Sequence, residues 1–216
     1  MWETGSDDTA LDIARQRIVR LRARGVEPII GLIHHGSGPP GMSLLDPGFA
    51  PGLAAHAAAV ARAFPDVMDW TPVNEPLTTA RFSCLYGLWF PHLADEGACW
   101  TALLTQIDAT RLAMRAIRRV NPAARLVQTD DLGEASSTPE LAGQRDFENR
   151  RRWLTWDLLA GQVVPGHELW DQLCRHGLEA RLRVIAADPC PADVIGINHY
   201  LSSNRFLTHR VDQHPV

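Results

Sequence analysis

Apolar residues follow two alternating patterns along this chain: short continuous runs and longer stretches with a helical period. Short apolar runs are typical of strands buried in a parallel sheet, whereas apolar residues at intervals of three and four are typical of amphipathic helices. Four runs predict strands, which span residues 28–33, 67–73, 124–129 and 193–197.

The stretches between these runs predict helices. They comprise a first helix that ends at Gly25, helices over residues 53–64, 103–120 and 138–158, and a weaker helix over residues 169–185. Strands that alternate with helices predict an α/β fold with a parallel sheet and right-handed crossovers. The periodicity alone allows an open sheet or a closed barrel, and no internal repeat or interdomain linker stands out.

Residues 77–97 are expected to form a long loop that carries the aromatic residues Phe82, Tyr86, Trp89 and Phe90. Such a loop after a strand can be a platform for a sugar ring, but the same side chains can instead pack the loop onto the rim of the sheet. Neither interpretation excludes the other.

Three of the four expected strands run directly into polar side chains. These are His34 and His35, then Asn74 and Glu75, and finally Asn198, His199 and Tyr200. Parallel strands end at one edge of a sheet, so these groups are expected to converge there and to hold a polyhydroxylated ligand. Their shared placement favours the barrel.

Glu75 lies between Asn74 and Pro76, directly after an apolar run. Proline disfavours helix for the residue before it and cannot donate to a strand ladder, so Pro76 is expected to hold Glu75 extended and to end the strand. The acid is then delivered to the loop mouth where parallel α/β proteins carry catalytic groups. The competing interpretation is a solvated loop acid without a function.

The composition excludes several classes of function. With 216 residues, 45% hydrophobic residues, 21% charged residues and a net charge of −4, we expect a globular protein with neither nucleic acid nor a membrane as partner. The absence of a bilayer-length apolar stretch or signal peptide predicts a cytoplasmic location. The run Arg150 to Arg152 follows acidic residues and is expected to be a solvated, locally paired face.

No cofactor and no metal are expected. A glycine-rich phosphate loop follows none of the strands, which argues against a nucleotide-binding fold. His34 and His35 are adjacent on a strand and would point to opposite faces, so both cannot easily reach one metal ion. The widely spaced cysteines are expected to be reduced thiols; they are Cys84, Cys99, Cys174 and Cys190.

The order of the polar motifs resembles glycoside hydrolase family 1, the β-glucosidase family of (β/α)8 barrels. The matching residues are His34, Asn74, Glu75, Asn198 and Tyr200, each after the corresponding strand. The resemblance implies a partial (β/α)8 TIM barrel that comprises about strands three to six with their helices.

Two departures from this family pattern put neighbouring sugar contacts in doubt. They are His35, where the family has tryptophan, and His199, where it has tyrosine. Residues 71–92 also resemble the glycosidase-like region of bacterial proteins that are fused to a dTDP-4-dehydrorhamnose reductase-like domain.

The resemblance implies a retaining β-glycosidase in which Glu75 is the general acid and then the general base. Asn74 corresponds to a group that bonds the sugar 2-hydroxyl, and His34 and Asn198 correspond to further sugar-site residues. Tyr200 corresponds to the phenol that donates to the nucleophilic carboxylate.

The nucleophile of the family lies on strand seven, and this sequence has no matching glutamate. Residues 1–216 are therefore expected to be a single barrel segment, incomplete at both ends and inactive alone, because hydrolysis needs two carboxyl groups. Asp130 and Asp131 are the in-chain substitutes, but from the neighbouring strand they would not face Glu75 across a sugar.

The expected partners are a carbohydrate substrate and either a missing barrel half or a fused reductase domain. The alternative function is a non-catalytic carbohydrate-binding or scaffold domain attached to a sugar-nucleotide reductase. An unrelated doubly wound hydrolase is a third, weaker alternative.

Overall fold

The computed structural model describes residue 2, residues 8–210 and residue 212, and its centre is a four-stranded sheet. The order is β1-β2-β3-β5, and each neighbouring pair is parallel, which confirms the predicted α/β class. The short strands β4 and β6 form a separate parallel pair. The strand bounds are β1 Ile29–Ile33, β2 Asp69–Val73, β3 Arg125–Asp131, β4 Ala135–Ser137, β5 Val194–Asn198 and β6 Arg205–Leu207.

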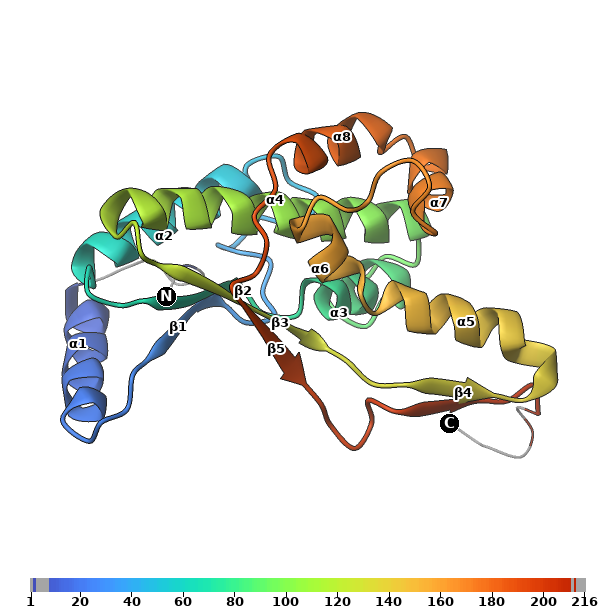
Figure 1. Ribbon diagram of the computed structural model, residues 1–216, viewed down its shortest axis with the longest axis horizontal. Helices are drawn as coiled ribbons and strands as arrows, with labels where there is room; N and C mark the ends of the chain where they lie inside the picture. The colour runs from blue at the N-terminus through green and yellow to red at the C-terminus, as the bar shows by residue number, and fades with distance from the viewer. Residues whose placement is uncertain (1, 3–7, 211, 213–216) are drawn as a thin grey trace.

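Helices connect the strands and cover one face of the sheet. Figure 1 shows α2, α4, α6 and α8 on the same side, with α1 at the edge beside β1. Parallel pairing requires such crossovers, because each connection must return the chain to the same end of the sheet. The helix bounds are α1 Asp8–Arg22, α2 Phe49–Ala63, α3 Pro76–Ala80, α4 Glu96–Val120, α5 Ala142–Arg151, α6 Leu154–Leu159, α7 Trp170–Arg175 and α8 Glu179–Ala187.

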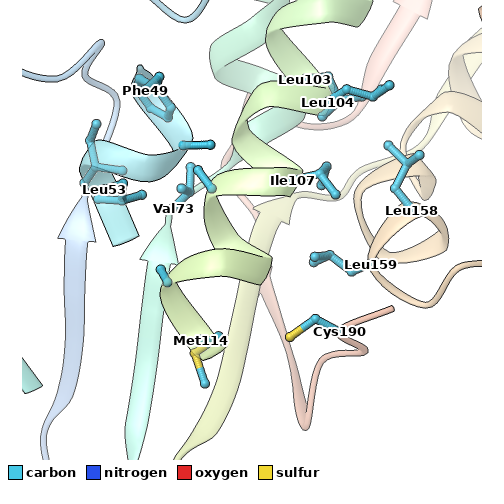
Figure 2. Packing of buried hydrophobic residues seen from close by; sticks show 14 of the residues in the cluster. Phe49, Leu53, Val73, Leu103, Leu104, Ile107, Met114, Leu158, Leu159 and Cys190 are labelled. Carbon is cyan, nitrogen blue, oxygen red and sulfur yellow. The ribbon is translucent and has the colours of Figure 1, made fainter. Parts of the chain in front are cut away.

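The core lies between this face of the sheet and the helices. Figure 2 shows α4 running lengthwise along the strands, with Leu103 and Ile107 among the packed side chains of the core. Trp70 from β2 and Leu126 from β3 enter the same layer, and both are almost completely buried. Burial of each such side chain contributes about 1.5–3 kcal/mol, so this layer holds the helices against the sheet.

The long helix α4 begins and ends where its sequence requires. Asp95 caps its start, because the carboxylate Oδ1 accepts a hydrogen bond from the N–H of Ala98 at 2.6 Å. Its end at Asn121 confirms the predicted stop before Pro122, because a proline disfavours helical geometry in the residue before it.

The expectation of a loop over residues 77–97 is wrong for its first part. α3 is followed by a short π-helix, Arg81–Leu85, before the chain turns toward α4. Leu77, Ala80 and Cys84 are fully buried at helical spacing, so one face of this segment packs into the core. The spacing of these three apolar residues is the sequence signal for this helical segment.

The prediction of a single helix over residues 138–158 is also wrong. Residues Pro139–Leu141 form a 3-10 turn, and the remainder is divided into α5 and α6. α5 is polar and lies beside β4, whereas five of the six residues of α6 are buried against the core. One straight helix could not satisfy both requirements.

The expected solvated, locally paired face at Arg150 to Arg152 is confirmed for the exposed Arg150 and for the local pairing of Arg151, but burial contradicts solvation of Arg151 and Arg152. The side chains of Arg151 and Arg152 are each only 3% exposed. Arg151 pairs with Glu148, and Arg152 donates to the carbonyl of Ser203 at 3.0 Å. The break between α5 and α6 turns these two side chains inward.

The four cysteines are free thiols, as predicted. No helix among the described residues combines the length and the apolar character that a membrane crossing needs.

Candidate active site

Glu75 stands at the junction between β2 and α3, in a left-handed conformation with φ 47° and ψ 61°. The predicted extended conformation is therefore wrong. Pro76 is the first residue of α3, and it excludes right-handed helical geometry at Glu75 but leaves the left-handed region available. The N–H of Glu75 donates to the carbonyl of Thr129 at 3.1 Å, which anchors the turn to β3.

The Glu75 carboxyl group is buried, with only 3% of the residue exposed. Its Oε1 accepts hydrogen bonds from Nδ2 of Asn198 at 2.5 Å and from the hydroxyl of Tyr200 at 3.3 Å. Its Oε2 lies 3.6 Å from Nε2 of His35. A solvated loop acid would have none of these neighbours, so that interpretation does not hold.

Asn74 links the ends of three strands. Its Oδ1 accepts from the hydroxyl of Thr129 at 2.8 Å and from Nδ2 of Asn198 at 3.2 Å. Its Nδ2 lies 3.5 Å from Nε2 of His35. Since these partners come from β1, β3 and β5, the parallel register of the sheet is what assembles the cluster.

The two adjacent histidines have different surroundings. His34 lines a hollow of about 420 Å³ on the sheet face opposite the helices, together with Thr71, Asn74 and Thr129. His35 lies inside the carboxyl cluster, and its Nδ1 is 3.0 Å from the hydroxyl of Thr79. The centroids of the two imidazole rings are 4.3 Å apart, and the ring planes are inclined at 63°.

The aromatic residues of the following segment pack around His35. The ring of Trp89 lies 5.0 Å from that of His35, and Phe82 lies 4.8 Å from Trp89. This contact agrees with the packing interpretation for these two residues. Tyr86 and Phe90 are partly exposed, and their contact with a ligand stays a prediction.

The electrostatics of the cluster follow from burial and from the Glu75 charge. Burial lowers the pKa of His35 to about 4, with a smaller contribution from His34, so the His35 ring is neutral at neutral pH. The nearby charge of Glu75 raises the pKa of Tyr200, which keeps the phenol a hydrogen-bond donor.

Asp130 lies between the sheet and the helices α3 and α6, and its carboxyl group does not face the open side of the sheet. It is completely buried, and its Oδ2 accepts from the N–H of Leu77 at 3.1 Å and from the hydroxyl of Thr155 at 2.6 Å. Its Oδ1 accepts from the hydroxyl of Thr78 at 3.2 Å and from the N–H of Asp131. Burial raises the pKa of Asp130 to about 6. Asp130 is thus a cap for α3.

All five residues selected from the sequence lie at the carboxyl ends of the strands. The structure brings Asn74, Glu75, Asn198 and Tyr200 into one bonded cluster, while His34 lies beside it in the hollow. Sequence reasoning missed His35 as a neighbour of Glu75. Its position after β1 was the available signal. Within the described ranges, no group of three or more metal-ligating residues could hold a metal ion.

Comparison with solved structures identifies the fold. A β-glucosidase from Thermotoga maritima in complex with deoxynojirimycin is 17% identical with a TM-score of 0.78, and 94% of this chain covers 48% of that chain. The AHE enzyme from Alicyclobacillus herbarius is 20% identical with a TM-score of 0.73, and 92% of this chain covers 48% of that chain.

A third similar structure is a Thermotoga maritima family 1 glycoside hydrolase with a cyclophellitol analogue, at 18% identity and a TM-score of 0.74. In that comparison 91% of this chain covers 46% of the other chain. No protein-family model and no curated protein sequence matches this chain.

These comparisons show a family-1-like glycosidase fold, and at such identities they show the fold alone. They confirm the predicted partial TIM barrel, since the chain spans about half the length of the structures it matches.

Proposed function

We propose that this chain carries the acid/base side of a retaining β-glycosidase site, with Glu75 as the proton donor and a carbohydrate as the substrate. The observation that carries the proposal is the buried Glu75 carboxyl group at the strand ends, bonded to Asn198 and Tyr200. A carboxyl group in such surroundings can protonate a leaving-group oxygen and later activate water.

The neighbouring residues supply sugar contacts in this proposal. Asn74, which precedes Glu75, and His34 line the hollow on the open face, and a sugar ring in that hollow would contact both side chains. Amide and imidazole groups bond sugar hydroxyl groups well because each offers a donor and an acceptor. Tyr200 donates to Glu75 here, and its predicted contact with a nucleophilic carboxylate stays a prediction.

We further propose that the second carboxyl group comes from outside the described residues. Asp130 is unsuitable because it is fully buried under α3, and Asp131 accepts a hydrogen bond from Ser203 at 2.5 Å. The source of the nucleophile would then be a second half of a barrel, either in a longer chain or in a partner. In this form the chain of 216 residues binds sugar but does not turn it over.

The test uses deoxynojirimycin, a basic imino sugar, as the probe in calorimetric titrations of the purified chain. The wild type is expected to bind, and Glu75→Gln is expected to weaken binding at least about tenfold, because the ammonium group loses its carboxylate partner. Glu27→Gln is the matched control: it makes the same charge change at an exposed residue before the start of β1. Equal affinity in wild type and Glu75→Gln would remove Glu75 from the site, and absence of binding would remove the sugar site.

Hydrolysis of activated aryl β-glycosides tests the second carboxyl group. We expect no turnover above that of Glu75→Gln. Turnover by the wild type that Glu75→Gln abolishes would place the second carboxylate within the chain and overturn that part of the proposal.

A non-catalytic carbohydrate-binding or scaffold domain joined to a sugar-nucleotide reductase is the alternative. The surroundings of Asp130 and Asp131 favour it: among the described residues Asp130 is fully buried and Asp131 accepts a hydrogen bond from Ser203, and such a domain needs no nucleophile. It predicts sugar binding that Glu75→Gln leaves intact.

A further inference from the structure

The turn that carries Tyr200 is exposed except at one residue. Tyr200 itself is 53% exposed, although its hydroxyl donates to the buried Glu75 carboxyl group at 3.3 Å. Residues 199–202 and Asn204 are exposed, whereas Ser203 is only 1% exposed. Since an exposed turn has little packing to fix its side chains, the position of the Tyr200 hydroxyl depends on how Ser203 is anchored.

Ser203 uses its hydroxyl, its N–H and its carbonyl at once. The hydroxyl donates to Oδ1 of Asp131 at 2.5 Å and accepts from the N–H of Tyr200 at 2.8 Å, which matches its one donor and its free lone pairs. The N–H of Ser203 donates to the carbonyl of Tyr200 at 3.0 Å. The carbonyl of Ser203 accepts from Nη2 of Arg152 at 3.0 Å. Two of these four bonds hold the backbone of Tyr200 itself.

Asp131 and Arg152 hold Ser203 from two sides. Asp131 ends β3, and Arg152 lies at the break between α5 and α6. Burial lowers the pKa of Arg152, and the charge of Asp131 acts in the opposite direction. Nε and Nη1 of Arg152 have no partner within the described ranges, so its hydrogen bond goes to Ser203. The turn is thus attached both to the sheet and to the helices.

We propose that Ser203, held by Asp131 and Arg152, is a positioning residue that keeps the Tyr200 hydroxyl on the Glu75 carboxyl group. Glu75 is buried, and the phenol fixes the rotation of its carboxyl group only while the turn holds Tyr200 in place. The proposal rests on the proposed function, because the acid that Tyr200 orients is the proposed proton donor.

The ionisation of Tyr200 reports its distance from Glu75. The charge of Glu75 raises the pKa of Tyr200, with smaller contributions from burial, from the hydrogen bond to Glu75 and from Asp131. On its own segment, the ring of the neighbouring His199 faces the carbonyl of Leu132 at 2.9 Å. Since Coulomb energy falls with distance, release of Tyr200 from Glu75 should lower its pKa toward the ordinary value of about 10.

NMR of the chain labelled at Cζ of tyrosine measures this pKa. The sequence contains only two tyrosines, so absence of a signal in Tyr200→Phe assigns the resonance. Glu75→Gln removes the charge and defines the full fall of the midpoint. Ser203→Ala should produce at least about half of that fall, since doubling the separation of two charges halves their Coulomb energy. A merely structural role of Ser203 would leave the midpoint where it is in the wild type.

Ser202→Ala is the matched control, because it makes the same chemical change at the exposed neighbouring residue. It should leave the Tyr200 midpoint unchanged. An unchanged or raised midpoint in Ser203→Ala would overturn the proposal, and so would an equal fall in Ser202→Ala.

Two further measurements decide the matter if Ser203→Ala does not fold or if alkaline samples unfold. Arg152→Met releases the Ser203 carbonyl. Loss of its positive charge would by itself raise the pKa of Tyr200, so a fall supports the proposal, and a rise or no change refutes it. The Cζ chemical shift at pH 8, where Tyr200 is neutral, should move in Ser203→Ala or Arg152→Met in the same direction as in Glu75→Gln. No movement would contradict the role.

These measurements need neither sugar binding nor turnover. If the Tyr200 signals respond as expected but deoxynojirimycin does not bind, the proposed function fails and the anchoring of Tyr200 stands. If the wild type binds the imino sugar through Glu75 and the Tyr200 signals do not respond, only the role of Ser203 is refuted.

Discussion

Asp130→Asn should remove part of the pH dependence of the free energy of unfolding. Asp130 is fully buried, and its pKa is raised from 3.8 to about 6, with burial as the largest cause. A carboxyl group with a raised folded-state pKa adds stability that is fully present below the unfolded pKa and is lost as the pH rises through the folded pKa. The relevant window is therefore about pH 4 to 6.

The magnitude follows from the shift and the hydrogen bonds. A shift of about two pH units at about 1.4 kcal/mol each gives a loss of about 3 kcal/mol in the wild type across this window. Asparagine does not titrate, but its NH2 group must face donors such as the N–H of Leu77, which costs about 1–3 kcal/mol. The variant should therefore be clearly less stable than the wild type at pH 4 and close to it at pH 7.5.

Urea unfolding followed by tryptophan fluorescence between pH 4 and 7.5 measures both free energies. Asp66→Asn, at an exposed position, is the control and should stay within about 0.5 kcal/mol of the wild type. If the difference in the free energy of unfolding between Asp130→Asn and the wild type is constant or grows with pH, the reasoning is refuted. It would mean that the four donors, and not burial, govern the ionisation of Asp130.

Two further predictions concern glycines and thiols. Gly133→Ala should destabilise the protein by about 1–3 kcal/mol, because the added Cβ would lie 2.3 Å from the carbonyl oxygen of Ser203. Gly143→Ala, at an exposed position of α5, places its Cβ within 4 Å of no other atom and should stabilise the protein by about 0.5–1 kcal/mol; urea unfolding measures both variants, and equal effects would contradict the steric argument. Cys84 and Cys99 are buried, and burial raises the pKa of their thiols to about 11 and about 12. After iodoacetamide treatment at pH 8, mass spectrometry should find both cysteines unmodified in the native protein and labelled in urea. Fast labelling of the native protein would show that this part of the core opens.

The sequence was sufficient for the four strands of the central sheet and for the convergence of polar side chains at their ends, but not for the short strands β4 and β6. Residues 28–33 and 193–197 read as strands because a buried parallel strand needs a continuous apolar run, and such a run is a local property. The polar residues after those runs had to meet once the strands were parallel. The choice of Asn74, Glu75, Asn198 and Tyr200 as site residues needed no more than this, together with the family resemblance.

The errors arose where distant contacts decide a local conformation. Pro76 restricts Glu75, but only the bond from Glu75 to Thr129 on β3 selects the left-handed turn. Arg151 and Arg152 look like a solvated pair in sequence, and the break after α5 buries them. His35 was read as a departure from a pattern because its contact with Glu75 crosses between β1 and β2.

The surroundings of Glu75 bear on how a chain that spans about half the length of the structures it matches can hold the acid of the proposed site. Oε1 accepts hydrogen bonds from Asn198, at the end of β5, and from Tyr200. Oε2 lies 3.6 Å from Nε2 of His35, and Thr129 and Thr79 hold the turn through backbone hydrogen bonds. These contacts come from α3 and from residues in or directly after the strands of the four-stranded sheet. A catalytic group is effective when its partners are already in place before the substrate arrives, since no reorganisation is then needed at the moment of reaction. The geometry around Glu75 is therefore set by residues of this chain, and in the proposed function the further group is the one on the opposite face of the sugar.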